Sequence, residues 1–119
     1  MERHCRIIFA ALLSILLVVK IAPAADTIKL GIAGAHSGDL ASYGLPTVKA
    51  AELAVKEINV RGGVLGRKVE LLVEDDACKP EIATNTATKL ISQGVPVVLG
   101  HTCSGATRAA IGLYNDAKI

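Results

Sequence analysis

Two cysteines, a serine and a tyrosine are the residues whose types and spacing could build a binding site. Cys78 and Cys103 each follow a strand-like run, at 69–75 and 95–100. In an α/β chain both sulfurs would lie at the carboxyl edge of one sheet, where ligands bind at topological switch points. In an exported chain such a pair is expected to form a disulfide, with free buried thiols as the alternative. The chain has no Cys-x-x-Cys motif, which argues against a thiol oxidoreductase.

Ser104 is the sharpest candidate for ligand contact. It follows Cys103 and precedes a helical stretch, so its hydroxyl can cap that helix. The free N–H groups and the positive dipole end of a helix start attract a carboxylate or a phosphate. Gly100, Gly105 and Ala106 are small enough to let a ligand approach the backbone. A purely structural cap is the alternative.

Tyr43 lies in a long loop of small residues, 34–44, after the first expected strand. This loop belongs to the same sheet edge as Ser104. Aromatic residues make up only 3% of the chain. One of them in a polar loop suggests a wall against a small ligand. The alternative is a tyrosine that rests on its own loop.

Other polar residues near this edge do not form a recognisable reactive site. Asp75 and Asp76 are an acidic pair beside Cys78, but the sequence shows no base or nucleophile next to them. A role in the turn and at the helix start is therefore favoured. His36 and His101 lack the spacing of a metal site and are expected to be hydrogen-bonded loop residues. We expect no metal, no cofactor and no enzymatic activity.

Strands and helices alternate three times along the chain. Apolar periodicity predicts the following elements: strands at 28–33, 68–75 and 95–99, and helices at 47–61, from Pro80 to before Gly94, and at 106–116. Such repeats imply a parallel sheet with right-handed crossovers, an α/β fold of three layers. The third strand is nearly all apolar, which predicts that both of its faces are covered.

The first 24 residues have the pattern of a secretory signal. Arg3 and Arg6 are basic, residues 7–19 are apolar except for Ser14, and Ala22-Pro23-Ala24 supplies a cleavage pattern before Ala25. An uncleaved membrane anchor is the alternative, but this run is shorter than the ~20 residues that a span needs. We therefore expect an exported protein.

Charge on the remaining residues, 25–119, is balanced. Three of the 13 basic and one of the 11 acidic residues lie before residue 25, so ten of each remain. No basic field is left to hold nucleic acid or an anionic membrane. About 95 residues are fewer than the ~100–150 typical of a domain. The chain stops where a fourth strand is expected, so we expect the front piece of a longer protein.

Five segments in order resemble one family. They are Ile28–Gly34, Ser37–Gly44, Gly62–Val69, Glu74–Cys78 and Gly100–Gly105. Together they are similar to periplasmic substrate-binding proteins of branched-chain amino acid ABC transporters, the Leu/Ile/Val-binding proteins. The resemblance covers essentially all of residues 26–119.

The resemblance implies a type I periplasmic binding fold, in which two α/β lobes close over an amino acid. It implies that Cys78 and Cys103 are bridged and that Ser104 binds the ligand α-carboxylate through its hydroxyl and backbone N–H. It also implies that Tyr43 packs beside the ligand. With Cys103 and Gly105, which flank Ser104, these residues are the predicted ligand-binding set.

The resulting hypothesis is a signal peptide at 1–24 followed, at 25–119, by an incomplete N-terminal part of the first lobe. The second lobe is expected beyond Ile119. The predicted function is capture of Leu, Ile, Val or a related amino acid in the periplasm for uptake through ABC transporter permease subunits. One alternative is the ligand-binding lobe of an amino acid or amide sensor. Another is an exported hydrolase or redox enzyme that uses Asp75, Asp76 or the cysteines.

Overall fold

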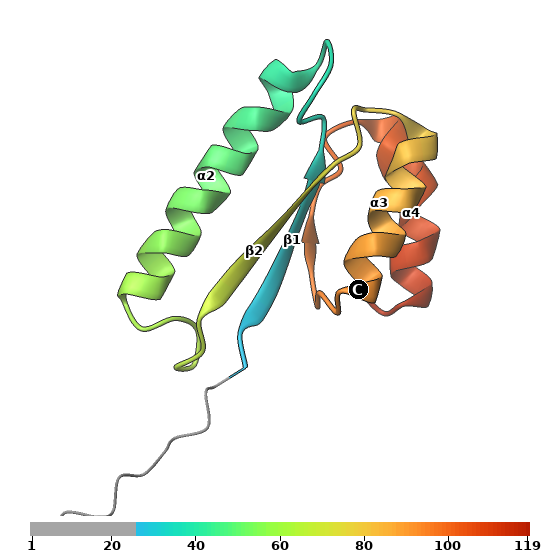
Figure 1. Ribbon diagram of the computed structural model, residues 1–119. Coiled ribbons are helices and arrows are strands. Elements are labelled where there is room, and N and C mark those ends of the chain that lie inside the picture. The colour runs from blue at the N-terminus through green and yellow to red at the C-terminus, as the bar shows by residue number, and fades with distance from the viewer. Residues whose placement is uncertain (1–25) are drawn as a thin grey trace, which may run out of the picture.

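The computed structural model describes residues 26–119, where three strands alternate with three helices (Figure 1). The predicted signal peptide lies outside the described residues. The elements in chain order are β1 (Ile28–Gly34), α2 (Ala41–Val60), β2 (Val69–Asp75), α3 (Pro80–Ser92), β3 (Val98–Leu99) and α4 (Ser104–Asp116). No helix within residues 26–119 combines the length and apolar character that crossing a bilayer requires.

The sheet is parallel and has the strand order β2-β1-β3. β1 pairs with β2 from Ile28 opposite Val69 to Gly34 opposite Asp75. It pairs with β3 only at Gly31 and Ile32. The chain thus moves to one side of β1 and then to the other, which places a topological switch point between the carboxyl ends of β1 and β3. The predicted parallel α/β sheet is confirmed.

Helices cover both faces of this sheet and create three layers (Figure 1). On one face, Val48 and Ala51 of α2 pack with Ile32 and the partly buried Leu71. On the other, Leu90 of α3 packs with Ala33 and Val95. Helices α3 and α4 also pack against each other, and each carries two fully buried alanines: Ala83 and Ala87 in α3, Ala106 and Ala110 in α4. Such small side chains let the two helix backbones approach closely.

Helix α2 begins at Ala41, six residues before the predicted start at Thr47. The prediction was wrong because Gly44 and Pro46 are poor helix formers, and tertiary packing overrides that preference. Gly44 is buried against the Ala35 carbonyl, and a Cβ at this position would collide with it. The glycine therefore lets the first turn of α2 pack on the loop after β1. As a consequence, Tyr43 lies on a helix and not in a loop.

Strand β3 is shorter and less covered than predicted. It spans two residues where the sequence predicted 95–99, and Val97 and Leu99 are 46% and 44% exposed. Pro96 has no N–H to donate to a ladder, so regular pairing begins after it. Helix α2 lies over β1 and β2, which leaves the Leu99 side open. The expectation of a strand buried on both faces was therefore wrong.

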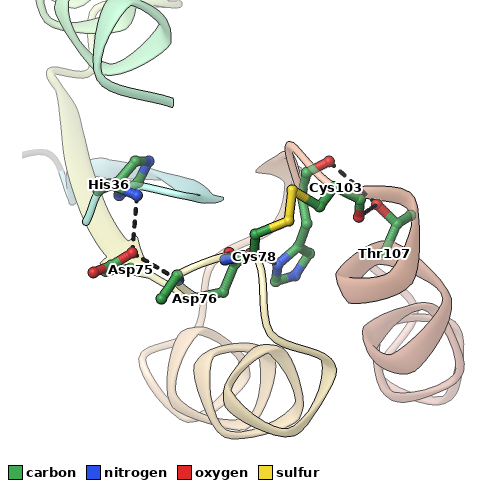
Figure 2. The surroundings of a disulfide bond; sticks show 8 residues. His36, Asp75, Asp76, Cys78, Cys103 and Thr107 are labelled. Atoms are coloured by element: carbon green, nitrogen blue, oxygen red, sulfur yellow. Dashed lines mark hydrogen bonds and ion pairs between the residues drawn. A yellow bond between two sulfur atoms is a disulfide. The ribbon is translucent and has the colours of Figure 1, made fainter. Parts of the chain in front are cut away.

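A disulfide joins the segments that follow β2 and β3. Cys78 and Cys103 are bridged, with their Cα atoms 5.5 Å apart (Figure 2). The bridge connects the start of α3 to the start of α4 at the carboxyl edge of the sheet. It is the pairing that the sequence predicted.

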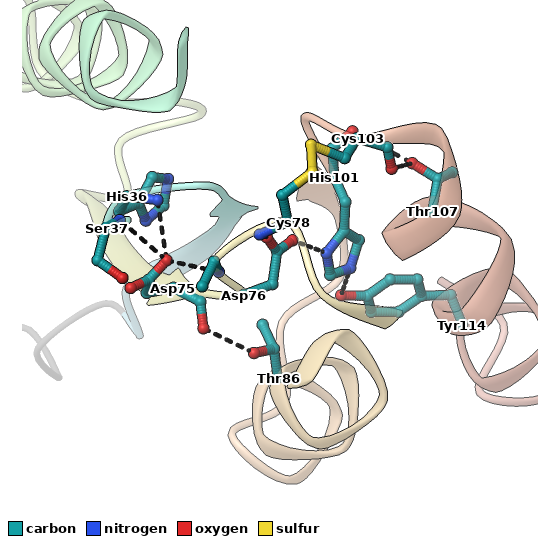
Figure 3. Close-up of polar contacts among 11 residues, drawn as sticks. His36, Ser37, Asp75, Asp76, Cys78, Thr86, His101, Cys103, Thr107 and Tyr114 are labelled. Carbon is teal, nitrogen blue, oxygen red and sulfur yellow. Dashed lines mark hydrogen bonds and ion pairs between the residues drawn. A yellow bond between two sulfur atoms is a disulfide. The ribbon is translucent and has the colours of Figure 1, made fainter. Parts of the chain in front are cut away.

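A buried polar chain runs beside the disulfide (Figure 3). Nδ1 of His101 lies 2.5 Å from Oδ2 of Asp76, and both side chains are almost completely buried. Nε2 of His101 lies 3.1 Å from the Tyr114 hydroxyl. The Asp76 carboxylate also accepts the Cys78 N–H at 2.7 Å, and the Asp76 N–H donates to the Gly34 carbonyl at 2.9 Å. The sequence placed no base beside Asp76, and the structure corrects this, because residues 25 positions apart meet only in the folded sheet.

The Tyr114 hydroxyl is held in its neutral form. Burial raises its pKa to about 12, and the negative charge of Asp76 acts in the same direction. A neutral phenol can donate to His101 or accept from it, which keeps the chain of polar contacts intact near neutral pH.

Removal of the disulfide should destabilise the fold. The double substitution Cys78→Ala/Cys103→Ala frees a loop whose ends are 25 residues apart. In the entropic model we expect the free energy of unfolding to fall by ~3–4 kcal/mol. Urea denaturation followed by circular dichroism measures this. A reductant should shift the wild-type midpoint to that of the double variant and leave the variant itself unchanged; equal midpoints for oxidised wild type and variant would contradict the expectation.

Tyr114 should make stability decrease at high pH. Its folded-state pKa lies above the ordinary value of ~10, so its contribution is complete below pH ~10 and is lost as pH rises through about 12. In the Tyr43→Phe variant, Tyr114 is the remaining tyrosine of residues 26–119, and tyrosinate absorbance reports it alone. Tyr114→Phe should remove the part of the stability loss that this hydroxyl causes. A tyrosinate midpoint near 10 in the folded Tyr43→Phe variant would refute the assignment.

Candidate functional site

A hollow of about 240 Å³ lies at the switch point between β1 and β3. Its walls come from the end of β1 (Ile32, Ala33), from the end of β3 and the loop after it (99–102), and from His36 and Thr47. Open α/β sheets bind ligands in the crevice at this place. The volume suits a small molecule or one part of it.

A larger hollow, about 490 Å³, lies at the opposite end of β1. Parallel sheets do not place ligand sites at the amino ends of their strands. Its two cationic side chains are also engaged, since Lys29 donates to the Gln93 carbonyl and Arg67 to the Asp26 carbonyl, each at 2.7 Å. We therefore place the candidate site at the smaller hollow.

Ser104 stands next to this edge as the first residue of α4. The residue at the N-cap is Cys103, and no side-chain hydrogen bond caps the helix, so the expected capping role of the Ser104 hydroxyl was wrong. The reason is that the extended backbone before the helix ends at Cys103. Ser104 is exposed, and its hydroxyl has no hydrogen-bond partner within residues 26–119. The first N–H groups of a helix also lack intrahelical partners, so hydroxyl and backbone donors are both available to an anion.

The neighbours of Ser104 hold the start of the helix in place. Cys103 is half-buried and bridged to Cys78. The Thr107 hydroxyl donates to the carbonyls of His101 and Cys103, at 3.2 and 3.0 Å, and fixes this loop on α4 (Figure 2). A Cβ at Gly105 would meet Pro80 only at an ordinary contact distance of 3.6 Å, so packing within residues 26–119 does not require a glycine there.

Tyr43 lies in the first turn of α2 and is 69% exposed. The Thr47 hydroxyl donates to its carbonyl at 3.3 Å, and Thr47 lines the hollow one turn further along. Tyr43 is thus linked to a lining residue of the hollow, and Ser104 follows another, Thr102, by two positions. Tyr43, Cys103, Ser104 and Gly105 are not among the residues that line it, so their ligand-binding roles stay predictions.

Asp75 shapes the loop that borders the hollow (Figure 3). Its carboxylate accepts N–H bonds from His36 at 2.8 Å, Ser37 at 3.3 Å and Ala77 at 2.8 Å. Burial opposes ionisation of this carboxyl, but the hydrogen bonds from the Ser37 side chain and from the three backbone groups outweigh it and lower its pKa. Asp75 therefore stabilises the turn after β2, which is the role that its sequence position favoured.

His36 and Thr102 were not among the predicted ligand-binding residues, yet both line the hollow. The expected hydrogen bonding of His36 holds only for its backbone; its ring Nδ1 is buried and has no partner within residues 26–119. Their positions directly after two strand ends were the signal that could have indicated them. No group of three metal-ligating side chains occurs in the described part of the chain.

Known proteins are similar to this chain in sequence and in fold. A family model described as periplasmic binding protein matches residues 27–119. The Leu/Ile/Val-binding protein of Escherichia coli K12 is 41% identical over 95 residues, which cover 80% of this chain and 26% of that protein. The leucine-, isoleucine-, valine-, threonine- and alanine-binding protein of Pseudomonas aeruginosa is 42% identical over 96 residues, 81% of this chain and 26% of that protein.

A solved structure agrees in fold as well. The branched-chain amino acid transporter substrate binding protein LivJ of Streptococcus pneumoniae, in complex with isoleucine, is 40% identical with a TM-score of 0.73, over 77% of this chain and 27% of that chain. The present chain spans about a quarter of the length of these relatives. Its three-layer α/β arrangement matches part of the type I periplasmic binding protein fold. With a family match that covers residues 27–119, the chain belongs to the periplasmic binding protein family.

Proposed function

We propose that this chain supplies the carboxylate-binding part of an exported amino acid-binding protein that serves an ABC transporter. The observation that carries the proposal is the start of α4. There an exposed Ser104 hydroxyl without a partner in residues 26–119 follows, by two positions, Thr102, which lines the hollow of the switch point. A carboxylate at this position would gain hydrogen bonds from the hydroxyl and from helix N–H groups, with support from the helix dipole.

Rigidity of the helix start supports this role. The disulfide, the Thr107 hydrogen bonds and the buried pair of Asp76 and His101 fix the loop before Ser104. A donor set that is ordered before the ligand arrives loses little conformational entropy on binding. Tyr43, exposed on the first turn of α2, would pack against the ligand from the other margin.

The ligand class is that of the relatives: leucine, isoleucine, valine or another small amino acid. One relative is named for threonine and alanine as well. The residues before Ala25 would direct the chain to the periplasm, and a second lobe would close over the ligand by hinge motion without chemistry. Permease subunits of the transporter are the proposed partners.

Two other roles were open from the sequence. A sensor or receptor lobe retains some support, because an extracellular ligand-binding receptor from Rhodopseudomonas palustris is 26% identical with a TM-score of 0.69 over 80% of this chain. Ligand-dependent uptake in cells with the permease would favour transport over signalling. The other role was an exported hydrolase or redox enzyme that uses Asp75, Asp76 or the cysteines. We favour it less, because Cys78 and Cys103 are bridged, Asp75 accepts the N–H groups of its turn, and Asp76 is buried against His101.

Ser104→Ala should weaken leucine binding by ~1–3 kcal/mol, because the charged ligand carboxylate loses the hydrogen bond that the Ser104 hydroxyl donates to it. Since the chain covers a quarter of its relatives, calorimetry uses a chimera in which residues 26–119 replace the matching segment of the E. coli Leu/Ile/Val-binding protein.

Ser92→Ala is the matched control, since Ser92 is exposed in the last turn of α3, where its hydroxyl contacts the Lys89 carbonyl. It should leave the affinity unchanged. Equal affinity for leucine in the Ser104→Ala and parent chimeras would overturn the assignment of Ser104.

A further inference from the structure

We propose that the side chain of Asn59 closes the outer edge of β2 against pairing with the same edge of a second copy of the chain. β2 stands at one end of the described sheet, since the strand order is β2-β1-β3 (Figure 1). A free strand edge is a template on which another strand can pair. This inference concerns self-association and does not depend on the proposed function.

The hydrogen bonds between β2 and β1 involve every second position of β2 and its flanking residues. The Ile28 N–H donates to the Lys68 carbonyl at 2.8 Å, and the Asp76 N–H donates to the Gly34 carbonyl at 2.9 Å. Because such bonds are evenly spaced in a parallel pair, the positions that face β1 are 68, 70, 72, 74 and 76. The N–H and C=O groups that point away from β1, along the outer edge, are those of positions 69, 71, 73 and 75.

Asn59, near the end of α2, occupies the first position of this outer edge. Its Nδ2 donates to the Val69 carbonyl and its Oδ1 accepts from the Val69 N–H, each at 2.8 Å. In an antiparallel pair of strands, one residue exchanges the same two bonds with the residue opposite. The Asn59 amide therefore takes the place of a neighbouring strand at Val69.

The other end of the outer edge is engaged as well. The Thr86 hydroxyl, from α3, donates to the Asp75 carbonyl at 3.1 Å. Within residues 26–119, no side chain contacts the outward N–H and C=O groups of Leu71 and Val73. Two positions of the seven-residue strand are thus open, and they lie between two that are engaged. An edge as short and interrupted as this resists pairing.

Charge on β2 opposes the same partner. Two copies of one chain associate most often about a two-fold axis. With the axis at Leu72, the centre of the open positions, Glu70 of one copy would lie opposite Glu74 of the other. Like charges directly opposite each other destabilise an antiparallel pair. Glu74 is paired with Lys89 at 2.8 Å, whereas Glu70 has no ion-pair partner within residues 26–119.

A variant that lacks both obstacles should dimerise. Asn59→Ala frees the backbone groups of Val69, and Glu70→Lys replaces repulsion by attraction to Glu74 of the other copy. We expect the parent chimera described above to sediment as a monomer. The same chimera with Asn59→Ala/Glu70→Lys should approach twice that mass as its concentration rises. Analytical ultracentrifugation measures both masses.

Two further variants of the chimera show whether the edge of β2 is the surface involved. Asn85→Ala/Glu70→Lys is the matched control, because Asn85 is an exposed asparagine of α3; it should stay monomeric. Val73→Pro, added to Asn59→Ala/Glu70→Lys, removes an N–H that a second strand needs and leaves the bonds to β1 in place. It should restore the monomer. Circular dichroism confirms that each variant is folded.

Amide hydrogen exchange on the parent chimera tests the same edge without any substitution. The Val69 N–H is bonded to Asn59 and should exchange slowly. The N–H groups of Leu71 and Val73 point outward and should exchange rapidly. In the Asn59→Ala/Glu70→Lys dimer, both of these N–H groups should become protected.

Dimerisation of Asn59→Ala/Glu70→Lys, with a monomeric control and a monomeric proline variant, supports the proposal. It is overturned if the double variant stays monomeric, if the control dimerises too, or if Val73→Pro leaves the dimer intact, since another surface then associates. A parent chimera that already dimerises through β2 also contradicts it. Where Asn59→Ala prevents folding, exchange in the parent decides: slow exchange at Val69 with rapid exchange at Leu71 and Val73 supports the proposal, and any other pattern overturns it.

Discussion

The buried pair of Asp76 and His101 holds the carboxyl edge of the sheet together. Burial of charged or strongly polar groups is unfavourable unless their partners are well placed. Here Asp76 satisfies His101, the Cys78 N–H and, through its own N–H, the Gly34 carbonyl. One residue thus links the ends of β1, β2 and β3. The disulfide between Cys78 and Cys103 ties the same loops covalently, so the start of α4 is fixed by two independent means.

Close packing of α3 against α4 complements that edge. The two helices contact each other, their buried alanines are small enough to allow close packing, and Tyr114 extends from α4 to His101. In the first turn of α4, Ser104 is exposed at the edge while Ala106 is fully buried. The start of α4 can therefore present Ser104 to solvent while the core beneath it stays covered. The opposite side of the edge, around Leu99, has no such cover within residues 26–119.

Strong local signals made much of the fold predictable. β1 and β2 were placed correctly because apolar runs of strand length are bounded by glycine and acidic turn residues. The end of α2 at Gly62-Gly63 was predictable as well, since both glycines adopt positive φ values that other residues avoid. The start of α2 and the extent of β3 were missed. Gly44 is helical only because it packs on Ala35, and Pro96 delays the pairing of β3.

The sequence by itself determined the α/β class and the position of Ser104 at a helix start, because both depend on neighbours along the chain. It also determined the disulfide partners, because Cys78 and Cys103 are the two cysteines of residues 26–119 and an exported chain favours their pairing. Tertiary structure decided that Cys103 and not Ser104 is the N-cap, that Asp76 meets His101, and that His36 and Thr102 share one hollow. The last two of these join residues tens of positions apart, which meet only when the switch at β1 brings the ends of separate strands to one edge. The spacing of these residues along the sequence does not indicate which of their side chains come together.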